Sequence, residues 1–149
     1  MNDYEQWEKE CEQIRKKNAK LLGKFAAHLI SEGLSPQTVE KHRFNIDFYI
    51  NEFLLNDDTI EPEVGIGEIS MYLGYWYIRK AASLSPSSIK ANAVSLKKFY
   101  GWMASIGKVD RGSVARMTAI IKKEMPIWTA RMDRYNDSSI EDMAEIWGI

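Results

Sequence analysis

Apolar residues recur every three or four positions along most of the chain, and this period predicts helices. The clearest stretch runs from Ser85 to Ile106. Ser85 is suited to cap this helix, Pro86 to occupy its first position, and Gly107 to end it. The spacing therefore predicts a helix with one buried apolar face, made of Ile89, Ala93, Leu96, Tyr100 and Met103.

The same period predicts five further helices, and no alternating strand pattern occurs between them. They cover residues 4–31, 36–55, 68–82, 111–124 and 139–147. Pro126 should end the helix over 111–124, because proline lacks the N–H that a helix interior requires. The acidic stretch 56–67 contains Pro and Gly and is typical of a loop. The chain is therefore predicted to be all-α, with five to six helices.

The helix predicted over 36–55 is apolar on two sides, which is typical of a helix between two neighbours. We expect Phe44 and Phe48, on one of those sides, to pack against the first helix rather than to stack on nucleic-acid bases. His42 lies in the opposite apolar stripe. A hydrogen-bonded structural histidine is the commoner occupant of such a position.

Positive charge is concentrated in one part of the chain, although the total net charge is only −1. Residues 69–132 hold eleven Lys and Arg against two acids, a net charge of +9, so the remaining residues carry −10. A local basic region can bind phosphate groups whatever the total charge is. Within it, Lys90, Val94, Lys97 and Gly101 share one ridge of the predicted helix, which is either a phosphate-binding surface or a solvated face.

The residues do not support an enzyme. His28 and His42 are the only imidazoles, and both lie at core-like helical positions. Cys11 is the only cysteine, and neither a glycine-rich phosphate loop nor a metal-binding spacing is present. We therefore expect no catalysis, no cofactor and no metal. The acidic N-terminus and short apolar runs predict a protein of the reducing cytoplasm without a membrane span.

Two parts of the chain are built alike at an offset of fifty residues, and in each a Leu-Ser-Pro signal precedes a predicted helix. They read FAAHLISEGLSPQTVEKHRFNIDFYINEFL and SLSPSSIKANAVSLKKFYGWMASIGKV. Together with the aromatic helix between them, these stretches resemble the N-terminal, SAM-like core-binding domain of tyrosine recombinases (phage integrases). The resemblance covers roughly residues 21–125.

The resemblance implies an orthogonal SAM-like bundle that forms one half of a clamp around duplex DNA. The helices over 36–55 and 86–106 would then face the major groove. Base edges would be within reach of Gln37, Thr38, Ser87 and Ser88, with Ala91 and Val94 nearby. Phosphate groups would be held by Lys41, Arg79, Lys90 and Lys97.

The chain also departs from that family. The family's catalytic domain would begin after about Met125, where only 24 residues remain. The catalytic Arg, Lys, His-x-x-Arg and Tyr set of the family has no matching positions. We expect a charged helical extension over 1–20, a core-binding-like domain over 21–132, and an acidic tail with a short helix over 133–149.

Two alternatives remain open at the level of sequence. The chain could be a protein-interaction module that binds a partner, or a second copy of itself, through its N-terminal helix or through the helix that contains Trp147. It could also be a fragment of a full site-specific recombinase. In all three cases the chain as it stands is expected not to catalyse strand exchange.

Overall fold

The computed structural model describes residues 2–80 and 86–148, with only the backbone of residues 86 and 87. The described residues form helices and no strand, which confirms the all-α prediction. The α-helices are α1 (Asp3–Ser31), α2 (Pro36–Asp47), α3 (Pro62–Gly65), α4 (Ile69–Met71), α5 (Tyr77–Lys80), α6 (Pro86–Ser105), α7 (Arg111–Asn136) and α8 (Met143–Trp147). Two π-helical segments, η1 (Phe48–Phe53) and η3 (Tyr72–Trp76), and one 3₁₀ turn, η2 (Ile66–Glu68), connect them.

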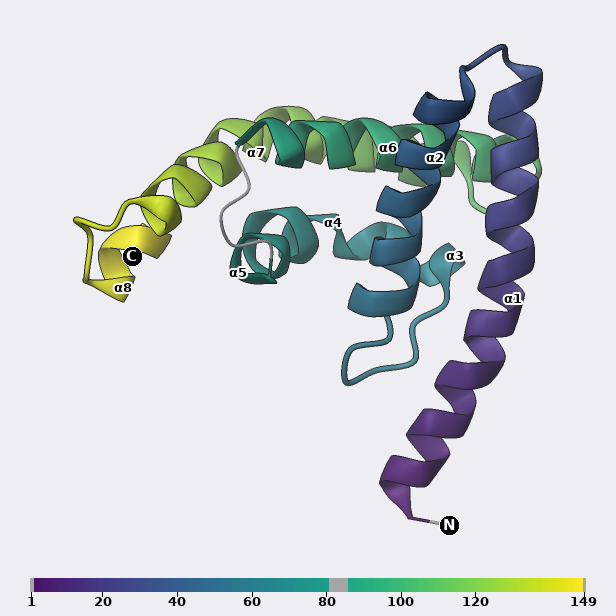
Figure 1. Ribbon diagram of the computed structural model, residues 1–149, viewed down its shortest axis with the longest axis horizontal. Coiled ribbons are helices and arrows are strands. Elements are labelled where there is room, and N and C mark those ends of the chain that lie inside the picture. Colours follow the sequence, from purple (N-terminus) through teal and green to yellow (C-terminus); the bar gives the residue numbers. More distant parts are fainter. Residues whose placement is uncertain (1, 81–85, 149) are drawn as a thin grey trace.

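Two pairs of long helices run across each other (Figure 1). The helices α1 and α2 lie side by side, and so do α6 and α7, with α2 also packed on α6. The short helices from α3 to α5 fill the space beside these pairs, and α8 lies at the far end of α7 (Figure 1). The α2–α6 crossing brings together the two stretches that carry a Leu-Ser-Pro signal.

Local signals at the start of α2 act as the sequence predicts. Gly33 has a φ of +87°, which lets the chain turn back after α1. The Ser35 Oγ then accepts a hydrogen bond from the Thr38 backbone N–H at 3.2 Å, and Pro36 takes the first helical position. The corresponding cap of α6, Ser85, lies outside the described residues.

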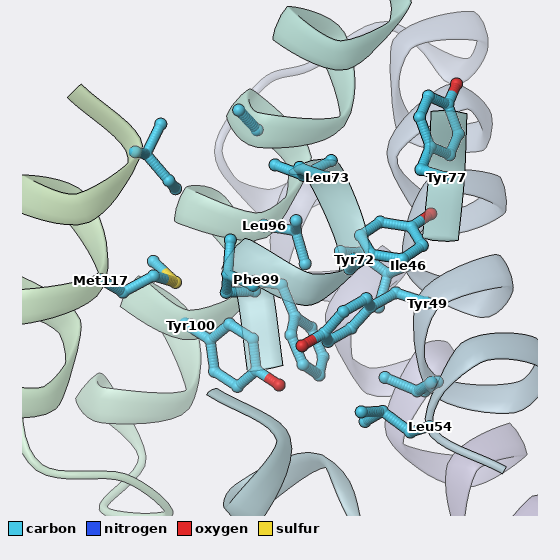
Figure 2. Close-up of a cluster of buried hydrophobic side chains, with 14 of the residues drawn as sticks. Ile46, Tyr49, Leu54, Tyr72, Leu73, Tyr77, Leu96, Phe99, Tyr100 and Met117 are labelled. Carbon is cyan, nitrogen blue, oxygen red and sulfur yellow. The ribbon is translucent and has the colours of Figure 1, made fainter. Parts of the chain in front are cut away.

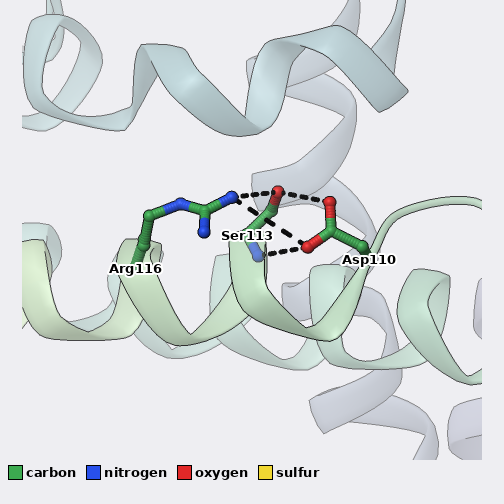
Figure 3. Close-up of polar contacts among 3 residues, drawn as sticks. All are labelled: Asp110, Ser113 and Arg116. Atoms are coloured by element: carbon green, nitrogen blue, oxygen red, sulfur yellow. Dashed lines mark hydrogen bonds and ion pairs between the residues drawn. The ribbon is translucent and has the colours of Figure 1, made fainter.

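The start of α7 is held by a polar cluster (Figure 3). One carboxylate oxygen of Asp110 accepts a hydrogen bond from the Ser113 backbone N–H at 2.7 Å, and the other accepts one from the Ser113 hydroxyl at 2.9 Å. Arg116 donates to the same hydroxyl at 3.0 Å. The hydrogen bonds from Ser113 lower the pKa of Asp110, so the cap stays charged. The predicted cap is therefore confirmed.

Aromatic residues fill the centre of the core (Figure 2). The rings of Tyr49 and Tyr72 meet edge to face, with centroids 4.7 Å apart. Their hydroxyls are satisfied by Gly65 O at 2.5 Å and Asn92 Oδ1 at 3.4 Å, and Tyr100 donates to Pro62 O at 2.8 Å. Burial raises the pKa of all three tyrosines well above its ordinary value. The aromatic helix after the acidic loop is thus centrally packed, as expected.

The prediction that Pro126 ends its helix is wrong, because α7 continues to Asn136. Beyond the proline, Trp128 and Met132 are each only 1% exposed. Burying two such side chains contributes about 1.5–3 kcal/mol each, which offsets the roughly 3 kcal/mol cost of an interior proline. Pro126 has no N–H for the backbone hydrogen bonds of the helix. Beside it, the Thr129 hydroxyl donates to Met125 O at 3.0 Å.

The expected packing of Phe44 and Phe48 against α1 is also wrong. Phe48 contacts Trp76 instead, with ring centroids 5.6 Å apart, because η1 packs against η3. Phe44 is 63% exposed. Thus η3 covers this side only at Phe48, and Phe44 faces solvent.

Smaller differences occur at the two ends of the chain. The last helix begins only at Met143 and is capped by Asp142, whose side chain accepts from the Ala144 backbone N–H. The front of α1 packs against Leu55, just after η1, through Cys11, Ile14 and Trp7. The Trp7 indole N–H also donates to Asp58 O in the acidic loop at 3.1 Å. That loop itself contains α3 and the 3₁₀ turn.

The contact between η3 and α7 gives a stability test. A Cβ at Gly74 would lie 2.5 Å from the buried Trp128 Nε1, so Gly74→Ala should lower the free energy of unfolding by about 1–3 kcal/mol. A Cβ at Gly23, in the middle of α1, meets nothing within 4 Å, and Gly23→Ala should raise stability by about 0.5–1 kcal/mol. Urea unfolding of both variants would measure this. Equal stability of Gly74→Ala and the parent would contradict the packing of α7 described above.

Candidate nucleic-acid interface

A groove of about 950 Å³ lies between α2 and the first half of α6, with Tyr77 of α5 also lining it. The α2–α6 contact forms it. Five of the residues predicted to contact DNA line it, namely Gln37, Thr38, Lys41, Ser88 and Val94. The structure thus brings together most of the predicted base-contacting residues from positions about fifty residues apart in sequence.

Four predicted residues lie elsewhere or are not described. Lys90 and Lys97 are exposed on α6, on the ridge that also carries Val94, but they do not line the groove. Arg79 is on α5, where its guanidinium donates to the Tyr75 hydroxyl at 3.4 Å and does not reach the groove. The side chain of Ser87 lies outside the described residues.

The floor of the groove is a buried hydrogen-bonded node around Ser95. The Ser95 hydroxyl donates to Ala91 O at 3.2 Å within α6. It accepts from the Asn45 side-chain amide at 3.0 Å and contacts the Nδ1 of His42 at 2.8 Å. Which of the two groups donates in the His42–Ser95 hydrogen bond depends on the histidine tautomer. In either tautomer this hydrogen bond holds His42, which is a structural histidine, as expected.

A second buried polar residue fixes the neighbouring turn of α6. The Asn92 side-chain amide donates to Ser88 O at 2.9 Å and to the Tyr77 hydroxyl at 3.1 Å, and its carbonyl accepts from Tyr72. Asn92 is 4% exposed, so these bonds hold it rigidly. The backbone around Ser88 is thereby held against the aromatic core at one end of the groove.

The cations around the groove are unevenly engaged. Within the described part of the chain, no carboxylate lies within ion-pair distance of Lys41, Lys90 or Lys97. Arg43 differs, since it forms a bidentate pair with Glu40 at 2.5 and 3.0 Å. The three lysines are thus available to an anionic ligand, whereas Arg43 is not.

The sequence prediction missed Phe44 and Asn45, which line the groove. It also missed Lys98, which is outside the groove lining but whose charge helps to lower the pKa of His42. The sequence spacing could have identified Phe44, because Phe44 is seven residues after Gln37 and lies on the same face of α2. The angle at which α6 crosses α2 decides the rest, and no sequence pattern specifies that angle.

The described residues offer little other chemistry. They contain no group of three or more His, Cys, Asp or Glu side chains that could hold a metal ion. None of the described helices has the length and apolar content needed to cross a membrane. His28 is half-buried, stacked on Trp102, and its Nε2 lies 3.7 Å from a carboxylate oxygen of Glu32.

Comparisons of the chain with protein-family models, with curated proteins and with solved structures found no match. The geometry of the groove is therefore the basis for the functional argument.

The neutral state of His42 gives a pH test of the groove floor. Burial, and then the charge of Lys98, lowers the pKa of His42 below its ordinary value of 6.5. As the pH falls below about 6.5, the unfolded chain takes up a proton that the folded chain does not, so the free energy of unfolding should fall. His42→Gln should show a shallower decline between pH 8 and 5 in urea unfolding. Identical pH profiles for the two proteins would contradict a neutral buried His42.

Proposed function

We propose that this protein is a non-catalytic module that binds duplex DNA through the α2–α6 groove and the cationic ridge of α6. The observation that carries the proposal is the convergence of Gln37, Thr38 and Ser88 on one open groove. The lysines beside it have no carboxylate partner among the described residues. Side-chain amides and hydroxyls can reach base edges, while lysines neutralise phosphates. The α2–α6 groove brings side-chain amides and hydroxyls together with a lysine, Lys41, on one face.

The chain's resemblance to core-binding domains of tyrosine recombinases agrees with this proposal. The long helices form two crossing pairs, which is compatible with an orthogonal SAM-like bundle (Figure 1). The resemblance assigns α2 and α6 to the major groove of DNA, and the same two helices line the protein's α2–α6 groove. Supporting contacts to the phosphate backbone would come from Lys41, Lys90 and Lys97.

The acidic residues limit the expected affinity. Glu40 lines the groove itself, and acids dominate the front of α1 and the residues after α7. Repulsion between these carboxylates and phosphates should make binding weak, on the order of micromolar or poorer at physiological salt. Fluorescence anisotropy with a random duplex measures this affinity, and absence of binding even at low salt would favour the protein-interaction alternative.

A charge-removal experiment tests the cationic ridge. Lys90 and Lys97 are exposed, so replacing both with Ala should change the free energy of unfolding by less than about 0.5 kcal/mol per site. If both contact phosphates, the slope of log K against log salt should become shallower by roughly 2 units, with weaker binding to all duplexes. Anisotropy titrations at several salt concentrations measure the slope.

The control for this experiment is the double variant Lys16→Ala with Lys17→Ala. These residues lie on α1 outside the groove, and Lys17 is paired with Glu61 at 3.1 Å. Their removal should change the slope less. An equal reduction for both pairs would show that the α6 ridge is not the DNA-binding surface.

The proposal also predicts that DNA is bound without chemistry. Incubation with supercoiled plasmid should give no nicking, no covalent protein–DNA adduct and no recombination, because the residues lack a tyrosine nucleophile with its activating cations. Agarose gels and denaturing protein gels would detect these products. A covalent adduct that maps to one of the tyrosines would overturn the non-catalytic assignment.

A further inference from the structure

The groove contains exposed apolar side chains that phosphate binding does not explain. Phe44 on α2 is 63% exposed and Val94 on α6 is 42% exposed, and both line the groove with Ala91. Single exposed apolar residues are common on protein surfaces. Here they come from two helices and line one concave surface among polar side chains, as in sites that recognise a partly apolar ligand.

The major groove of DNA offers one apolar group to such a surface. Adenine, guanine and cytosine present nitrogen, oxygen and N–H groups there, and thymine alone adds a C5-methyl. On the basis of the proposed function, we infer that the α2–α6 groove reads A·T base pairs, with Phe44 and Val94 contacting thymine methyl groups. Phe44 and Val94 are then removed from water by contact with the thymine methyl, the only apolar group on the base edges.

The polar side chains of the groove are consistent with the same base pair. Gln37 is exposed and forms no hydrogen bond with the described residues, so its amide is available to pair with N6 and N7 of adenine. Asn45 is less suitable, because its side-chain N–H₂ already donates to Ser95 at 3.0 Å. Gln37 and Phe44 are two helical turns, about 10 Å, apart on one face of α2. Base pairs are about 3.4 Å apart, so the two side chains would meet base pairs roughly three steps apart along the major groove.

The test compares duplexes that differ only in the methyl group. Two 20-bp duplexes share one A·T-only sequence, and in the second every thymine is replaced by uracil. Wild-type protein should bind the uracil duplex about fourfold more weakly for each methyl contacted, as expected for losing the burial of one methyl-sized group. The combined variant Phe44→Ala with Val94→Ala should bind the two duplexes equally. Both side chains are exposed, and circular dichroism checks that the variant folds.

Two controls make the result specific. Ile30→Ala removes an apolar side chain from α1 that is also 63% exposed but does not line the groove, and it should keep the wild-type preference for thymine. A G·C duplex carrying 5-methylcytosine restores a methyl group at the same place in the major groove. Wild-type protein should bind it more tightly than the unmethylated duplex.

The outcomes separate this inference from the proposed function. Equal binding of wild-type protein to the thymine and uracil duplexes would overturn the role of Phe44 and Val94 while leaving DNA binding intact. A preference for thymine that survives in the double variant would likewise overturn it. Absence of binding to every duplex at low salt would overturn the proposed function, and the assignment of A·T recognition with it.

Discussion

The contact of α2 with α6 through Ser95 is the constraint on which the groove depends. Ser95 is fully buried and joins His42, Asn45 and the backbone of Ala91 in one node, so neither helix can slide without leaving a buried polar group unpaired. An apolar contact at this crossing would tolerate small shifts, because apolar packing is less directional than hydrogen bonding. The node therefore fixes the relative position of two helices that are far apart in sequence, and with it the width of the groove.

Much of the fold could be predicted from the sequence because local signals and burial agree in most helices. The caps Ser35 and Asp110 each accept the expected backbone hydrogen bond, and the apolar stripe from Ile89 to Met103 is buried. Pro126 shows where local reasoning fails. Its effect on the backbone is local, whereas the burial of Trp128 depends on η3, more than fifty residues earlier in the chain. Tertiary packing then outweighs helix propensity.

The candidate site was only partly predictable for a related reason. Residue type and helical spacing identify which side chains share a face of α2 or α6, and five predicted residues do line the groove. Spacing does not say which neighbour covers a face. Phe44 was expected to be packed because α2 is apolar on two sides, yet it is exposed, whereas Phe48 on the same side packs against Trp76. Arg79 likewise lies beside Tyr75, whose ring packs on Trp147 of α8, and its positive charge alone does not indicate that position.

The distribution of charge explains how a chain with a net charge of −1 can present a cationic surface. The lysines on α6 extend away from its buried stripe, and the described residues provide no carboxylate to pair with Lys90 or Lys97. Acids are instead concentrated on α1, in the loop before α3 and after α7. At physiological salt the Debye length is about 8 Å, so a phosphate against α6 responds mainly to the nearest lysines and only weakly to the distant acids. Lowering the salt concentration lengthens the distance over which the lysines and the acids both act on the phosphate. The attraction by the ridge and the repulsion by the acids should then grow together, which makes the salt dependence of binding smaller than the number of exposed lysines alone implies.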